Sequence, residues 1–127
     1  KRMVDFSGLQ LNHRDPVYLQ IASYTKKRIL AGRISDGDLL PSRREIAAIL
    51  GINPNTAQKA FRYMEEEGYV ITTGNTGSRV HVDDKIRSRI ETEMTEDMVR
   101  EFIQSAKDIN LSFKKVFDLI SHMWEEI

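Results

Sequence analysis

The sequence of 127 residues contains no cysteine, which excludes a disulfide scaffold, a cysteine-ligated zinc site and a thiol nucleophile. No apolar run approaches the roughly 18 residues that a membrane span requires, and residues 1–30 lack the apolar core of a signal peptide. Hydrophobic residues still make up 40% of the chain, enough for a packed core. We therefore expect a cytoplasmic protein of about one domain, without membrane association.

Residue patterns typical of enzymes are also missing. The three histidines, His13, His81 and His122, are scattered and do not have the spacing of metal-binding motifs. The chain has no phosphate-binding glycine-rich loop and no Gly-x-Ser-x-Gly nucleophile motif. We therefore predict that the protein is not an enzyme and uses no cofactor and no dedicated metal site.

Charge is balanced overall, with 19 basic and 19 acidic residues, but its distribution is uneven. Residues 1–82 carry 12 Lys and Arg against 8 Asp and Glu, whereas residues 83–127 carry 7 against 11. A basic N-terminal part followed by an acidic C-terminal part favours a polyanion-binding module joined to a segment that does not touch the polyanion. Mixed-charge surfaces are common, so charge alone leaves both interpretations open.

The first 40 residues predict an arm, a helix and a short strand. Asp15 and Pro16 predict a helix start, because Asp is a good N-cap and Pro tolerates the first helical position. The helical pattern ends at Gly32, and a turn then leads to a short strand at Leu39-Leu40. The preceding residues 1–15 have no clear period, and their candidate anchors are Phe6, Leu9 and Leu11.

Two short helices follow, with a tight turn between them. Ser42 and Glu45 have the spacing of a capping box, and Gly51 supplies a stop. Asn53-Pro54 starts a second helix, which runs to Glu67. This order is the outline of a helix-turn-helix unit. The apolar side of the first helix is predicted to consist of Ile46, Ala47, Ile49 and Leu50.

Beyond the second helix the period changes to two. Residues 69–73 and 78–82 predict a β-hairpin with a four-residue tip at 74–77. Two further helices follow, one from Lys85 to Ile109 and one capped by Ser112. The fold is therefore predicted to be mainly α with a small β-hairpin wing (α+β). The predicted segments are an arm (1–15), a winged helix-turn-helix domain (16–82) and a two-helix tail (83–127).

The second helix of the paired unit separates into two faces. Its apolar face, predicted to lie in the core, consists of Ala57, Ala60, Phe61 and Met64. The opposite face has side chains that can read base edges or contact phosphates, namely Asn55, Gln58, Lys59 and Arg62. An ordinary solvated face is the alternative for this helix alone, but the paired helices and the hairpin favour DNA binding.

Two other features point the same way. Arg43 and Arg44 lie in the first turn of their helix, where cations oppose the helix dipole, which suggests phosphate or base contacts. Gly77 would let the hairpin tip approach a surface closely, as insertion into a minor groove requires. The alternatives are two solvated arginines and a plain turn glycine.

About residues 16–82 resemble the winged helix-turn-helix domain of the GntR family of bacterial transcription regulators. The resemblance implies a dimer that places the second helix of the unit in the major groove of operator DNA and the hairpin wing at the minor groove. Its most specific parts are Leu40-Pro41-Ser42-x-Arg44-Glu45, Leu50-Gly51-Ile52, Thr56 and Glu67-Gly68-Tyr69.

The resemblance also implies individual roles. Arg44 and Thr56 match DNA-contacting residues of the family, and Gly77 matches the wing-tip glycine. The sequence departs from the family where Arg43 replaces a usual Glu, which should add a phosphate contact, and where Asn75 replaces the first wing glycine. Asn53-Pro54 replaces a usual Ser-Arg, so one arginine contact is missing and Asn55 is the candidate to compensate. The complete set of predicted DNA contacts is Ser42, Arg43, Arg44, Asn53, Asn55, Thr56, Gln58, Lys59, Arg62, Thr76 and Gly77.

The segment Asn53–Thr56 and the short tail look like the YtrA-like subfamily. Forty-five tail residues cannot form the large ligand domains of other GntR members, and their apolar faces need a partner, most simply a second copy. We expect Asp83-Asp84 to be a hinge and any small-molecule effector to bind at the dimer interface or between tail and DNA-binding domain. The predicted dimer contacts are Ile90, Met98, Phe102, Phe113, Phe117, Ile120 and Trp124.

These observations predict a homodimeric transcriptional regulator, a repressor, that binds an inverted-repeat operator in double-stranded DNA. The alternative is a winged-helix module that binds another protein and no DNA, because a fold does not fix a function. The outward polar face of the second helix favours DNA. Salt dependence separates the two, since DNA affinity falls steeply with salt.

Overall fold

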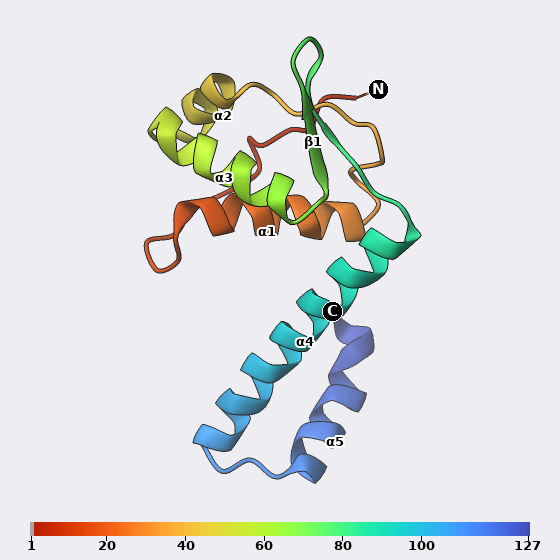
Figure 1. Ribbon diagram of the computed structural model, residues 1–127. Coiled ribbons are helices and arrows are strands. Elements are labelled where there is room, and N and C mark those ends of the chain that lie inside the picture. Colours follow the sequence, from red (N-terminus) through yellow and green to blue (C-terminus); the bar gives the residue numbers. More distant parts are fainter. Residues whose placement is uncertain (1) are drawn as a thin grey trace. The chain divides into compact units, whose positions relative to one another are not determined.

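The computed structural model describes residues 2–127, and the predicted α+β class with a hairpin wing is confirmed (Figure 1). By compactness the chain divides into two units, of which the first ends at Ile90 and the second covers Glu91–Ile127. The elements are α1 (Val17–Leu30), α2 (Arg43–Leu50), α3 (Pro54–Glu66), β1 (Val70–Thr73), β2 (Gly77–Val80), α4 (Asp84–Asp108), α5 (Phe113–Met123) and a 3-10 turn, Trp124–Glu126.

In the first unit α3 packs against both α1 and α2. The apolar face predicted for α3 is buried, as expected. Since this face carries the core contacts, the opposite face of α3 is left for solvent or a ligand. The core of the unit includes the fully buried side chains Ile21, Ile29, Ile46, Phe61, Met64, Tyr69 and Val80.

The predicted signals at the ends of α2 and α3 are present. The Ser42 hydroxyl oxygen accepts from the Glu45 amide (3.1 Å), and the Glu45 carboxylate accepts from the Ser42 amide (2.9 Å). Gly51 has the left-handed conformation (φ 67°) and ends α2. Asn53 then caps α3, because its side-chain oxygen accepts from the Asn55 amide (2.7 Å). These local bonds fix the angle of the turn between the two helices.

Two predictions about helix ends and faces are wrong. Pro16, not Asp15, is the N-cap of α1, because the Pro16 carbonyl accepts the first helical hydrogen bonds, from the amides of residues 19 and 20. Ile49 is 48% exposed rather than part of the apolar side of α2. Viewed down the helix axis, Ile49 lies roughly 110° from the middle of the strip that Ile46, Ala47 and Leu50 form. Because α2 packs only this strip against the core, Ile49 stays exposed to solvent.

The N-terminal segment is part of the first unit rather than a free arm. The Val4 amide donates to the Leu39 carbonyl (2.7 Å), and the Leu39 amide donates to the Arg2 carbonyl (2.8 Å). Leu39, predicted as strand, also forms a bridge with Arg79 of β2. Val4 and the predicted anchor Phe6 are buried. The segment therefore extends the wing sheet by one further bridge, and the predicted boundary at 15/16 lies inside a compact unit.

The hairpin is shorter than predicted, and its tip has three residues rather than four. β1 pairs antiparallel with β2 from Val70↔Val80 to Thr73↔Gly77. Gly77, with φ 75°, therefore starts β2 instead of closing the tip. Three-residue hairpin loops commonly place a left-handed residue at this point.

The residues around the predicted hinge at Asp83-Asp84 are fixed by hydrogen bonds to the first unit. Asp83 caps α4 by accepting from the Ile86 amide (2.7 Å), and the Val82 amide donates to the Asp36 carboxylate (2.8 Å). Ile90 is fully buried. The prediction of a hinge here is therefore wrong, and Ile90 is a core residue of the first unit rather than a surface available to a second copy.

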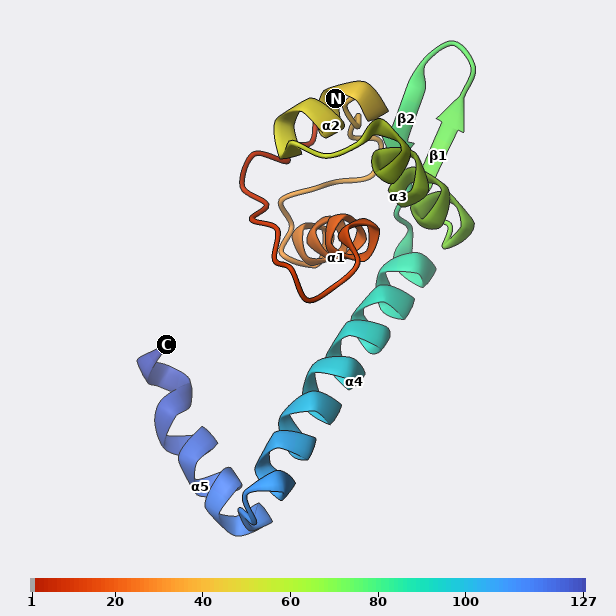
Figure 2. The ribbon, with the colours of Figure 1, turned by 90° about the vertical axis from the view of Figure 1, so that its left-hand side faces the viewer.

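In the second unit α4 ends at Asp108, one residue before the predicted Ile109. Asn110 follows in the left-handed conformation (φ 58°), and Ser112 caps α5 as predicted. α5 turns back from the end of α4 and the two helices diverge (Figure 2). Ala106 is buried there, whereas most larger apolar side chains are exposed. In the described part of the chain no helix is long and apolar enough to cross a membrane. The most exposed large side chains are Met98, Ile109, Phe113, Phe117, Trp124 and Ile127.

Candidate nucleic-acid interface

The outward face of α3 carries the side chains that the sequence predicts. Asn55, Lys59 and Arg62 are exposed, and Gln58 is half-buried. The first-turn amides that follow Pro54 donate to Asn53, so it is the positive end of the helix dipole that favours an anion at this end of α3. Thr56 is half-buried.

Aromatic side chains from α1 flank this face on one side. The Lys59 ammonium lies 4.3 Å from the centroid of the Tyr18 ring, a distance at which the ring attracts a cation. The Tyr18 ring in turn meets the Tyr63 ring edge-on, at 5.5 Å between centroids. The Tyr18 contact limits the positions of the Lys59 side chain, which stays exposed. Sequence reasoning missed Tyr18, because its neighbour on α3 is about 40 residues away.

The two adjacent arginines at the start of α2 differ in their surroundings. The Arg43 guanidinium lies 4.4 Å from the centroid of Phe61 and 3.7 Å from the Glu65 carboxylate, both on α3. Arg44 is exposed and has no ion pair or hydrogen bond from its side chain within residues 2–127. Arg43 thus joins α2 to α3, and Arg44 remains available to a ligand.

Three of the predicted contact residues are engaged in caps or contacts within the domain. Ser42 and Asn53 use their side-chain oxygens as helix caps, and Arg43 packs on α3. The backbone hydrogen bond from Ser42 holds the pKa of the Glu45 carboxyl below its ordinary value. Glu45 is therefore ionised at neutral pH, and it keeps the capping box closed beside Arg44.

The hairpin tip is exposed from Thr72 to Gly77. The hydroxyls of Thr73 and Thr76 form a hydrogen bond with each other, which ties the two sides of the tip together. Gly77 needs its left-handed φ of 75°, although a Cβ there would meet no atom within 4 Å. Asn tolerates the left-handed conformation better than most residues, but Asn75 does not adopt it here. The tip is thus a small polar projection beside α3.

No group of three His, Asp or Glu side chains in residues 2–127 is arranged to hold a metal ion. The cations of the interface, Arg44, Lys59 and Arg62, come from α2 and α3. Together with Asn55 and the hairpin tip they form what we call the α3 face. Its chemistry is that of a cationic surface with amide groups, which can bind phosphates and base edges.

Comparisons with known proteins agree with this geometry. The family model described as "Bacterial regulatory proteins, gntR family" matches residues 17–80. The chain is 31% identical over 114 residues to the HTH-type transcriptional repressor YtrA of Bacillus subtilis, covering 88% of this chain and 87% of that protein.

Two solved structures are similar over nearly the whole chain. A GntR family transcriptional regulator from Listeria monocytogenes superposes with a TM-score of 0.78 at 27% identity, covering 88% of this chain and 98% of that one. YtrA from Sulfolobus acidocaldarius, a GntR-family transcription factor, gives 0.52 at 30% identity, covering 94% and 97%. The chain therefore belongs to the gntR family of bacterial regulatory proteins, DNA-binding transcriptional regulators, and within it to the YtrA-like subfamily.

Proposed function

We propose that this regulator represses transcription by binding an inverted-repeat operator as a homodimer. The observation that carries the proposal is the α3 face, where the amide of Asn55 and the cations of Lys59 and Arg62 are exposed along the outward side of one helix. Residues 16–82 supply the DNA contacts in this proposal, and residues 83–127 the contacts between copies. The name of the Bacillus subtilis relative, a transcriptional repressor, supports repression.

Each residue of the α3 face has a role that follows from its chemistry. Asn55, near the start of α3, can bond the edge of an adenine with both amide atoms. Lys59, Arg62 and Arg44 contact phosphates or guanine. Gln58 and Thr56 contact the flanks of the same groove, and the tip with Thr76 and Gly77 reaches the minor groove. Ser42, Arg43 and Asn53 support the interface by holding α2 and α3 in place.

The exposed apolar surface of the second unit supports pairing with a second copy. Phe113 and Phe117 on α5 and Trp124 in the 3-10 turn that follows are 83%, 58% and 75% exposed, more than an isolated monomer usually leaves to water. Val99 and Ile103 on α4 add further exposed apolar area. A two-fold axis would cover these surfaces on both copies at once.

A salt titration of DNA binding tests the α3 face. A plot of the logarithm of DNA affinity against the logarithm of salt concentration is a falling line. Its slope steepens by about 0.9 for each phosphate that the protein neutralises. We expect Arg44→Ala and Arg62→Ala each to lower this slope by about one, and Arg33→Ala, which removes an exposed arginine outside the α3 face, to leave it unchanged. Wild-type slopes in both variants would refute the assignment of this face, and no salt-dependent DNA binding would favour the protein-binding alternative.

Sedimentation tests the dimer. Phe117→Asp places a charge on the apolar side of α5 and is expected to give monomers. His122→Asp adds a carboxylate at an exposed position roughly 140° away around the same helix, and it should leave the dimer intact. If Phe117→Asp sediments as the wild type does, the interface lies elsewhere.

A further inference from the structure

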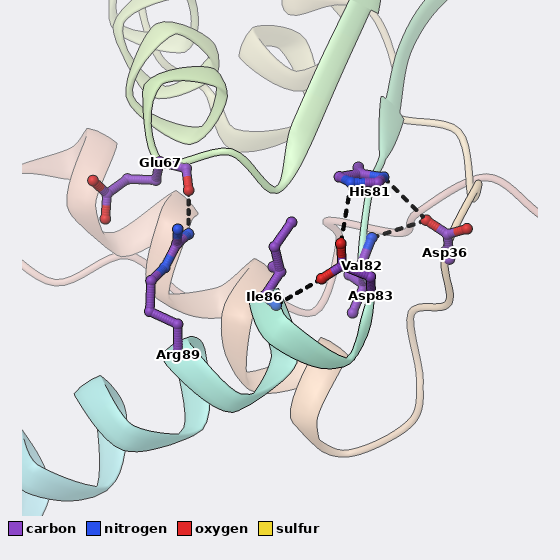
Figure 3. Close-up of polar contacts among 7 residues, drawn as sticks. All are labelled: Asp36, Glu67, His81, Val82, Asp83, Ile86 and Arg89. Carbon is purple, nitrogen blue, oxygen red and sulfur yellow. Dashed lines mark hydrogen bonds and ion pairs between the residues drawn. The ribbon is translucent and has the colours of Figure 1, made fainter.

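The first two turns of α4 are attached to the DNA-binding unit by a set of polar contacts (Figure 3). His81 lies between two carboxylates, 3.7 Å from Asp36 and 3.8 Å from Asp83. Asp36 also accepts from the Val82 amide, and Asp83 accepts from the Ile86 amide. The chain therefore enters α4 in a fixed direction relative to the segment that follows α1.

Two arginines of α4 then bind the ends of two other helices. The Arg87 guanidinium donates to the Ile29 carbonyl (3.0 Å), in the last turn of α1. The Arg89 guanidinium donates to the Glu67 carbonyl, at the C-cap of α3. Carbonyls at a helix end carry partial negative charge, which favours an arginine there. The Ile29 carbonyl also accepts from the Gly32 amide (3.1 Å), so Arg87 adds a second donor to it. Through Arg89, α4 is joined directly to the end of α3.

The Arg89 contact is at the opposite end of α3 from Asn55, the residue proposed to read a base edge. Glu67 follows Asn55 by twelve positions, which corresponds to about 18 Å along a helix. The Arg89 guanidinium also lies 4.0 Å from the point where a Cβ of Gly68 would be. Arg89 thus contacts the backbone just after α3, and its link to recognition is through the position of that helix.

We propose that Arg89 is a positioning residue for operator recognition, which holds α3 relative to α4 and thereby sets the separation of half-sites that the regulator prefers. The proposal rests on the proposed function, since it requires a dimer on two half-sites. α4 continues without interruption from Asp84 to Asp108, into the segment with the exposed apolar faces. Within the first unit, Arg89 thus joins the end of α3 to the beginning of the helix that carries on into that segment.

The test compares full-length wild type, Arg89→Gln, Arg89→Lys and the control Arg100→Gln. Arg100 is an exposed arginine of α4 whose side chain pairs with Asp97 of the same helix, so its loss changes charge without touching α3. Binding is measured to a single half-site, to the inverted repeat at its preferred spacing, and to the same repeat with one base pair inserted. Sedimentation and thermal unfolding check assembly and folding.

We expect Arg89→Gln to reduce the preference for the correct spacing by about threefold to tenfold, with half-site affinity and salt slope unchanged. Arg89→Lys, which keeps a donor, should restore part of the preference, and Arg100→Gln should behave as wild type. An unchanged preference in Arg89→Gln would overturn the proposal, as would an equal loss on the single half-site, which indicates a DNA contact or a folding defect. If wild type binds the inverted repeat no better than the half-site, the proposed function itself fails.

Discussion

Replacing Arg43 and Arg44 one at a time should separate stability from DNA binding. The Arg43 guanidinium is 4.4 Å from the centroid of Phe61 and 3.7 Å from the Glu65 carboxylate, and its side chain is 32% exposed. A cation over an aromatic ring contributes about 0.5–2 kcal/mol, depending on its exposure, and a partly exposed ion pair at most about 1 kcal/mol. Arg43→Ala should therefore lower the free energy of unfolding by about 1–2 kcal/mol.

Each kcal/mol lost lowers Tm by about 4–8 °C in a domain of roughly 60–100 residues, so Arg43→Ala should lower Tm by about 4–16 °C. Arg44→Ala should change the free energy of unfolding by less than about 0.5 kcal/mol, as exposed substitutions usually do, yet lower the salt slope of DNA binding by about one. Thermal unfolding and salt titration of the two variants measure both effects. Arg43→Leu keeps apolar contact with Phe61 and should fall between wild type and Arg43→Ala in Tm.

The reasoning would be refuted by the reverse pattern. If Arg43→Ala unfolds at the wild-type temperature and lowers the salt slope by about one, then Arg43 contacts phosphate, as its replacement of the family's usual Glu predicted. If Arg44→Ala unfolds several degrees earlier, its side chain has a structural role in the domain.

Three further substitutions or truncations test other parts of the structure. A chain ending after Ile90 should unfold at a higher temperature than one ending after Asp84, because full burial of Ile90 contributes about 1.5–3 kcal/mol; equal Tm values would contradict this. Hydrogen bonding to Ser42 lowers the pKa of Glu45 in the folded protein, so its stabilisation is present at neutral pH and lost as pH falls below 4.5 through the folded pKa. The difference in Tm between wild type and Glu45→Gln should therefore shrink as the pH falls through this range, and a difference that stays constant would contradict the prediction. Asn55→Ala should relax base preference at one position, by about 1–3 kcal/mol, with no change in Tm; unaltered preference in binding to single-base operator variants would remove Asn55 from readout.

The helix-turn-helix unit was predictable because its signals are local. The capping box of Ser42 and Glu45, the left-handed Gly51 and the Asn53-Pro54 start each depend on residues within a few positions. The exposed face of α3 follows from helical periodicity alone. These features could be predicted since no distant part of the chain changes them.

The features that sequence reasoning missed depend on distant contacts. Arg43 points toward α3 because Phe61 and Glu65 lie beside it once the helices pack. Val4 is buried next to a single bridge between Met3 and Leu39, which is too short to give a period in the sequence. Ile90 continues the apolar stripe of α4 but is buried in the first unit, and nothing in the stripe marks that change.

Selection of bound duplexes from a random DNA pool by the full-length protein tests the central claim most directly. A homodimer that reads DNA with the α3 face should enrich an inverted repeat whose half-site centres are about one helical turn, roughly 34–36 Å, or a multiple of it apart. Arg62→Ala should enrich the same repeat more weakly. Enrichment of sequences without two-fold symmetry, or of no sequence at all, would contradict the account.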